Sequence, residues 1–213
     1  MLPARILTVF IFAACAGTPS AQSPEALSAE QTASEPVETD ASSSEWQDTD
    51  TGLLHVESGV TCPSFVGDFT FTGEVSFSGQ GESKDVACNY IAEAGGAIRL
   101  HITRFARAVT TDAYLKGSLE TVRDRYRQSA DIPAPRTGED REITTAAAAL
   151  RTDAVSANRP GTPVDTALWI EQLGGWHIKV RATYETDRTS AVAEAVSTLF
   201  GSVRADLSDL TLY

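Results

Sequence analysis

The sequence predicts an α+β domain, in which an antiparallel sheet carries two amphipathic helices packed on one face. Several short runs alternate apolar and polar residues with the period of two that half-buried strands show. Two longer runs repeat apolar residues at helical spacing. The order of these runs is strands, helix, strands, helix, so the domain is expected to consist of two hairpin-plus-helix halves.

The first half contains the clearest strand pattern. Earlier strands are expected at 53–57 and 69–77. Residues 86–90 and 98–102 both alternate apolar and polar side chains, and a glycine pair between them supplies the turn of a hairpin. Arg99 and His101 fall on the polar side of the second of these strands.

The first helix is expected to begin near Asp112, with Thr111 or Asp112 as its N-cap. Pro133 and Pro135 end it and open a loop. The apolar face of this helix consists of Leu115, Leu119, Val122 and Tyr126. Residues 142–156 mix helix-favouring alanines with β-branched residues, and we interpret them as two strands of a meander.

The second half repeats the arrangement with strands around 168–170 and 178–182. A three-residue loop at 173–175 would pair Ile170 with Ile178, whereas a two-residue loop would set Ile170 beside Lys179. Since a slip of one residue turns every side chain to the other face, the odd-length loop is expected. The last helix is expected over about 189–205, and its buried face consists of Val192, Val196, Leu199 and Val203.

The polar face of this sheet is the candidate ligand surface. In the expected register, Trp169 lies across from Lys179, and Glu171 lies across from His177. Cations beside an aromatic ring can hold an anionic or peptide ligand, whereas the simpler interpretation is a solvated sheet face stabilised by cross-strand pairs. The candidate residues are Trp169, Glu171, His177, Lys179, Arg181, Arg99 and His101.

Residues 1–14 have the parts of a secretory signal peptide, with Arg5 before a short apolar run and small residues at its end. The run of nine residues is too short to cross a membrane as a helix. The residues around Cys15 resemble the lipobox of bacterial lipoproteins, which implies a lipid on Cys15. In that pattern Ala16, in place of Asp, implies sorting to the outer membrane. The same residues also fit ordinary signal peptidase, which would release a soluble periplasmic protein.

Residues 15–52 are expected to form a disordered tether behind the lipidated cysteine. From Ala16 to Gly52 the chain has eight acidic residues and no basic ones. It also has few large apolar side chains, too few to offset the entropy of ordering. The folded domain is therefore expected to span 53–213.

Two cysteines, Cys62 and Cys88, remain when Cys15 is set aside. In an exported protein a disulfide is the default for such a pair. It would close a loop of 26 residues, and the chain-entropy model assigns such a loop about 3.5 kcal/mol of stabilisation.

The motifs and the net charge of the sequence give no support to a metal-dependent, a hydrolytic or a nucleic-acid-binding function. The three histidines lie in no metal-binding spacing, and no nucleophile elbow is present, so no metal, cofactor or catalytic residue is assigned. The net charge of −12 does not suggest nucleic-acid binding.

Four segments carry a resemblance to known proteins. Residues 58–63 (SGVTCP), 85–90 (DVACNY), 100–104 (LHITR) and 175–184 (GWHIKVRATY) resemble a group of exported alphaproteobacterial proteins of unknown function. The resemblance covers most of 53–213. It implies an envelope location and a cysteine pair, and it carries no assigned activity.

The function expected from these features is that of a non-catalytic cell-envelope lipoprotein. Its domain would bind a partner protein or a small ligand in the periplasm, and its lipid would hold it to the membrane. One alternative is an envelope enzyme with His101, His177 and Glu171 as its acid and base groups. The other is a soluble periplasmic structural protein.

Overall fold

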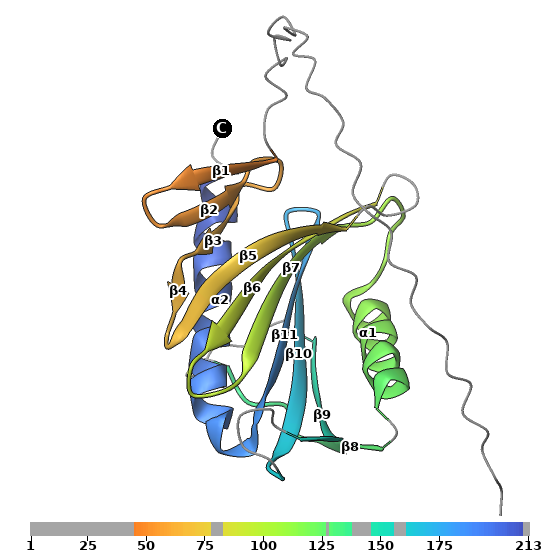
Figure 1. The fold of residues 1–213 in the computed structure, drawn as a ribbon. Helices are drawn as coiled ribbons and strands as arrows, with labels where there is room; N and C mark the ends of the chain where they lie inside the picture. Colours follow the sequence, from red (N-terminus) through yellow and green to blue (C-terminus); the bar gives the residue numbers. More distant parts are fainter. Residues whose placement is uncertain (1–44, 78–82, 127, 138–145, 156–160, 211–213) are drawn as a thin grey trace, which may run out of the picture. The chain divides into compact units, whose positions relative to one another are not determined.

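In the part of the chain that the structure describes, eight antiparallel strands form the main sheet, and three more form a small second sheet (Figure 1). The computed structural model describes residues 45–77, 83–126, 128–137, 146–155 and 161–210. The main sheet, in spatial order, consists of β4 (Phe65–Val66), β5 (Phe69–Phe77), β6 (Lys84–Ala92), β7 (Ala97–Arg104), β11 (Trp176–Glu185), β10 (Pro163–Leu173), β9 (Ala146–Val155) and β8 (Ser129–Ile132). The small sheet consists of β1 (Trp46–Thr49), β2 (Gly52–His55) and β3 (Val60–Pro63).

The described ranges contain two α-helices, α1 (Thr111–Arg125) and α2 (Thr189–Leu210), and the short 3-10 helix η1 (Thr186–Arg188) leads into α2. Each helix follows a hairpin, β6–β7 before α1 and β10–β11 before α2. The predicted α+β class and the two hairpin-plus-helix halves are therefore confirmed. Among the described residues no helix is long and apolar enough to cross a membrane.

The helices do not share one face of the sheet, as the sequence predicted, but cover opposite faces. Neighbouring residues of β10 point in opposite directions. Leu168 packs with Val122 of α1, whereas Trp169 belongs to the core cluster that contains the α2 residues. The prediction was wrong because it treated the polar side of the sheet as solvated, and α1 lies over part of that side.

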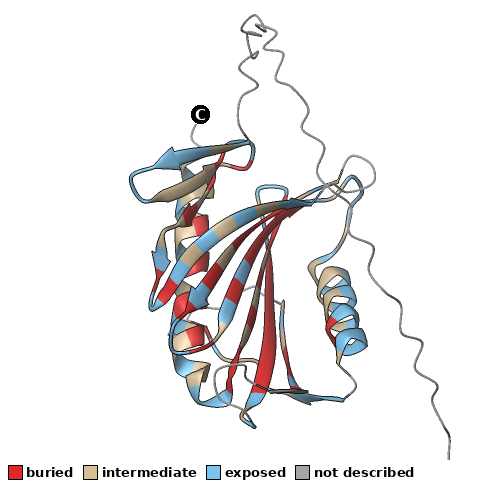
Figure 2. Cartoon of the chain, viewed as in Figure 1, coloured by how far each residue is buried: buried red, intermediate tan, exposed pale blue. Residues whose placement is uncertain are grey.

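The main core lies between the sheet and α2. The predicted buried face of α2 is confirmed, because Val192, Val196, Leu199 and Val203 are completely buried. They share one cluster with the apolar side chains of β6, β7 and β11. Figure 2 shows buried residues along these strands, and β10 beside them is buried along most of its length. The disulfide between Cys62 and Cys88 lies in the same cluster and ties β3 to β6, with the two Cα atoms 6.2 Å apart.

The hairpin between β10 and β11 turns through two residues, Gly174 and Gly175, and not through the predicted three. Both have positive φ angles, 54° and 86°, as the tight two-residue hairpin turn requires. Ile170 therefore pairs with Lys179. This register differs by one residue from the predicted one, but it exposes no apolar side chains of β10 to water. Helices cover both faces of the sheet, and β10 is buried on both sides along most of its length.

Three further boundaries differ from the predictions. Strand β1 falls inside the predicted tether and pairs with β2, so the folded chain begins by Glu45 and not at Leu53. Within 142–156, residues 146–155 form a single strand, β9, and its partner β8 was not predicted. The N-cap of α1 is Thr110, whose side chain accepts a hydrogen bond from the backbone of Ala113. The signal peptide, Cys15 and the tether as far as residue 44 lie outside the described residues.

Candidate functional site

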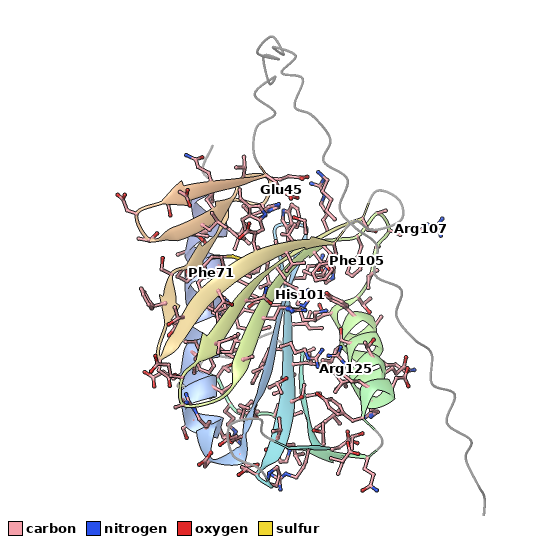
Figure 3. All side chains as sticks on the ribbon, viewed as in Figure 1. Glu45, Phe71, His101, Phe105, Arg107 and Arg125 are labelled. Carbon is pink, nitrogen blue, oxygen red and sulfur yellow. A yellow bond between two sulfur atoms is a disulfide. The ribbon has the colours of Figure 1, made fainter. Side chains whose placement is uncertain are left out.

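A cleft of about 440 Å³ lies between α1 and the strands β6, β7 and β11, and we call it the α1 cleft. In Figure 3, His101 marks its sheet side and Phe105 its upper end. Its apolar lining includes Phe77, Phe105, Val122 and Leu168. Its titratable lining residues are Asp85, Arg99, His101, Tyr114, Lys179 and Arg181.

The sheet register brings together the predicted residues of β7 and β11. Lys179 pairs with His101, Arg181 pairs with Arg99, and His177 lies opposite Thr103 on the same face. Both strands alternate as the sequence predicted, so their polar sides fall on the face that α1 covers.

Trp169 and Glu171 do not belong to this face, and their assignment to it was wrong. The two-residue turn places Trp169 opposite Val180 and Glu171 opposite Ile178, on the side of α2. There the Trp169 indole donates to the carbonyl of Pro135 at 3.2 Å. A catalytic site made of His101, His177 and Glu171 is therefore excluded, because Glu171 lies on the other side of the sheet from both histidines.

Lys179 is the central cation of the α1 cleft. Its side chain is half-buried, and its ammonium lies 4.6 Å from the centre of the Tyr114 ring. It makes no ion pair with any of the described residues. Burial lowers the pKa of Lys179 to about 8, and the positive charges of Arg181 and Arg99 act in the same direction, whereas Asp85 opposes them. At neutral pH Lys179 therefore holds a charge that no described residue neutralises at contact distance.

Among the described residues, Asp85 is the one carboxylate that lines the α1 cleft. The Thr103 hydroxyl donates to its Oδ1 at 2.8 Å, and the Nδ1 atom of His101 lies 3.3 Å from the same oxygen. Because Thr103 uses its single hydrogen there, the Tyr114 hydroxyl donates to Thr103 at 3.1 Å. This network joins β6, β7 and α1 and holds the Tyr114 ring over Lys179.

The same network accounts for the protonation of Asp85 and His101. Burial alone would raise the pKa of Asp85, but hydrogen bonds from His101 and Thr103 keep it below its usual value. Burial lowers the pKa of His101, and the contact with Asp85 only partly opposes this. His101 is therefore neutral at pH 7, and the negative charge of Asp85 is directed toward His101 and Thr103.

A second hollow of about 420 Å³, which we call the distal pocket, shares Arg99 and Arg181 with the α1 cleft. Its third cation is Arg125 of α1, which is labelled in Figure 3. The Arg99 Nε atom donates to the Asn89 side chain at 2.6 Å, and Tyr126 hydrogen-bonds Arg181. No carboxylate lines this pocket in the described part of the chain.

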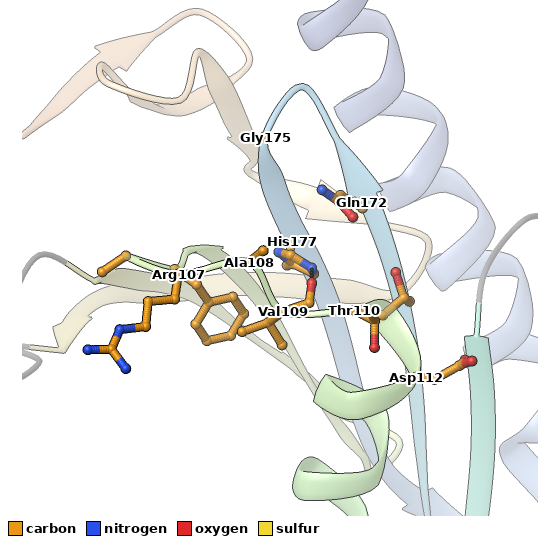
Figure 4. A pocket seen from close by; sticks show the side chains of 11 residues that line it. Arg107, Ala108, Val109, Thr110, Asp112, Gln172, Gly175 and His177 are labelled. Atoms are coloured by element: carbon orange, nitrogen blue, oxygen red, sulfur yellow. Dashed lines mark hydrogen bonds between the residues drawn. The ribbon is translucent and has the colours of Figure 1, made fainter.

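His177 lies apart from these cations, in a separate hollow of about 630 Å³ at the start of α1 (Figure 4). Its Nε2 atom donates to the Val109 carbonyl at 3.0 Å, and its ring packs against Phe105 and Tyr114. Burial lowers the pKa of His177. The side chain thus fastens the loop before α1 to β11, and it contributes no charge to the α1 cleft.

Sequence reasoning missed Asp85, Tyr114 and Arg125. Asp85 could have been found, because it directly precedes the predicted strand at 86–90. It is two residues before Ala87 and four before Asn89, so it falls on the predicted polar side of that strand. Tyr114 and Arg125 could not, since nothing in the helix pattern indicates that α1 faces the polar side of the sheet. Within the described ranges no cluster of three histidine, cysteine or acidic residues could hold a metal ion.

No family model, curated protein or solved structure matches the chain. The resemblance to exported alphaproteobacterial proteins therefore stays a prediction.

Proposed function

We propose that the protein is a cell-envelope binding protein whose α1 cleft holds an anionic ligand. The observation that carries the proposal is Lys179, a half-buried ammonium without an ion-pair partner among the described residues. A charge taken out of water is costly unless an opposite charge or hydrogen bonds compensate. Arg99 and Arg181 add two further cations beside it, and Asp85, the one carboxylate among the described lining residues, is engaged by His101 and Thr103. An anionic ligand would supply the missing compensation.

The proposal includes an envelope location. Its support is the signal-like start of the chain, the lipobox-like residues around Cys15, and the Cys62–Cys88 disulfide, a bond typical of oxidising compartments. Mass spectrometry of the mature N-terminus tests the anchor. An acylated Cys15 is expected, and a free amine at Gly17 or later would remove the anchor from the proposal.

The ligand site is tested by titrating the domain with inorganic phosphate and with glutarate in a calorimeter. We expect the unmodified protein to bind at least one of the two anions, and Lys179→Met to reduce the affinity at least tenfold. Lys116→Met is the matched control, because Lys116 is exposed on α1 outside the cleft and its removal changes the net charge equally. Equal losses in both variants, or no binding by the unmodified protein, would overturn the proposal.

The pH dependence of binding gives a second readout. The pKa of Lys179 is about 8, so the ammonium loses its proton as the pH rises from 7 to 9.5. The affinity for glutarate, whose charge is constant over this range, should fall through that window. A flat profile would show that Lys179 does not contact the ligand.

A further inference from the structure

The cations of the α1 cleft and the distal pocket form two rows across β7 and β11. The proximal row pairs Lys179 with His101, and the distal row pairs Arg181 with Arg99. Alternate residues of a strand lie on one face and about 7 Å apart along it. Two centres of positive potential therefore follow each other along the sheet at that spacing, with the wall of α1 beside them.

Each row can hold one anionic group. In the proximal row, Lys179 carries the charge because His101 is buried and donates to Asp85. In the distal row, Arg181 and Arg99 present guanidinium groups, and Arg125 of α1 lines the same pocket. Guanidinium groups bind carboxylates through paired hydrogen bonds. A ligand with a single charge would leave one of the two rows uncompensated.

We propose that the ligand is an extended acidic peptide with carboxylates on alternate residues. The inference rests on the proposed function and names the chemical class of the anionic ligand that the α1 cleft would hold. Alternate side chains of an extended peptide lie on one side at the same spacing of about 7 Å as the two rows. A single phosphate can occupy only one row, and the carboxylates of adjacent residues point to opposite sides of an extended chain.

Apolar side chains at the two ends of the surface fit a peptide better than a small anion. Phe77 lines the α1 cleft and is 38% exposed, and Ile91 lines the distal pocket and is 53% exposed. Both are among the large apolar side chains that the described residues leave most exposed. They can contact the residues that flank the two carboxylates.

Two blocked peptide isomers, Ala-Glu-Ala-Glu-Ala and Ala-Glu-Glu-Ala-Ala, test this inference. They have the same composition, length and charge, so non-specific attraction affects both equally. We expect the first isomer to bind about tenfold more tightly in calorimetric titrations. Arg181→Gln should abolish this preference while Lys179 retains weak binding of both isomers. Arg107→Gln is the control, because Arg107 is exposed and lines neither pocket of this surface.

The outcomes separate the two proposals. Equal affinity for the two isomers would overturn the inference that the ligand has carboxylates on alternate residues. It would not contradict the proposed anion-binding site. Binding of phosphate without binding of either peptide would overturn it in favour of a small inorganic anion. Failure of both phosphate and glutarate to bind would overturn the proposed function, and this inference with it.

Discussion

Each face of the main sheet carries a helix, but the two faces differ in whether their buried charged side chains form ion pairs. On the α2 face, the Glu171 carboxylate receives two hydrogen bonds from the Arg204 guanidinium, at 3.1 and 2.6 Å, and the remaining contacts are mostly apolar. On the α1 face, Lys179 has an aromatic neighbour and no ion pair among the described residues.

This difference separates what holds the fold together from what is free for a ligand. Stability alone favours an apolar interior in which the rare buried charges are paired. The α2 face follows that rule and encloses the disulfide as well. The α1 face departs from it, and a departure of this kind is a mark of functional sites.

The largest expected effect concerns the core beneath α2. Leu199→Ala should lower the free energy of unfolding by roughly 4 kcal/mol, because Leu199 is completely buried and its removal leaves a cavity. Leu119→Ala on α1 is the matched variant, and it should cost less than half as much since Leu119 is only partly buried in a small cluster. Urea unfolding measures both, and equal costs would contradict the division between the faces.

The disulfide should have the next largest effect. Replacing both Cys62 and Cys88 by Ala should cost about 3.5 kcal/mol in urea unfolding, because the 26-residue loop is no longer closed in the unfolded chain. Both cysteines lie in the α2-side cluster, so the affinity of the α1 cleft for glutarate should stay within a factor of two. A large loss of affinity in a variant that is still folded would show that the two faces are coupled.

Removing a charge from the α2 face should be destabilising. Glu171→Gln leaves Arg204 without its carboxylate, and we expect a loss of about 1–2 kcal/mol, since Arg204 keeps some access to water. Thermal unfolding at pH 7 measures this loss. Glu120→Gln on the exposed side of α1 is a control of equal charge change and should be close to neutral. An unchanged stability in the Glu171 variant would show that the pair contributes nothing to the α2 face.

The sequence predicted the polar face of the sheet correctly only on the strands where apolar and polar residues alternate. Arg99, His101, Lys179 and Arg181 alternate with apolar residues on β7 and β11, and their shared face follows from that pattern alone. Strand β10 is buried on both of its sides, and its residues 167–170 are apolar without interruption. No alternation of apolar and polar residues therefore shows which side of the sheet each of its residues faces. The predicted faces of Trp169 and Glu171 depended instead on the length of the turn, and the run Leu173-Gly174-Gly175 fits a turn of either two or three residues.

The smallest expected effect has the opposite sign and is the sharpest test of the comparison. Lys179→Met removes a half-buried charge but keeps the long side chain beneath Tyr114. We expect it to raise the free energy of unfolding at pH 7 by roughly 1 kcal/mol, which corresponds to about 2–4 °C in the melting temperature. The same variant should lose ligand affinity, so stability and binding would change in opposite directions.

The gain should also depend on pH in a defined way. The pKa of Lys179 is about 8 in the folded protein, below the value of about 10.4 for an unfolded chain. Between these values the unfolded chain binds more protons, so the stability of the unmodified protein rises with pH there. The advantage of Lys179→Met should therefore be largest below pH 8 and vanish near pH 10.5. Melting curves of both proteins from pH 6 to 10 measure it, and a constant difference or a loss at pH 7 would show that the charge of Lys179 serves the fold and not a ligand.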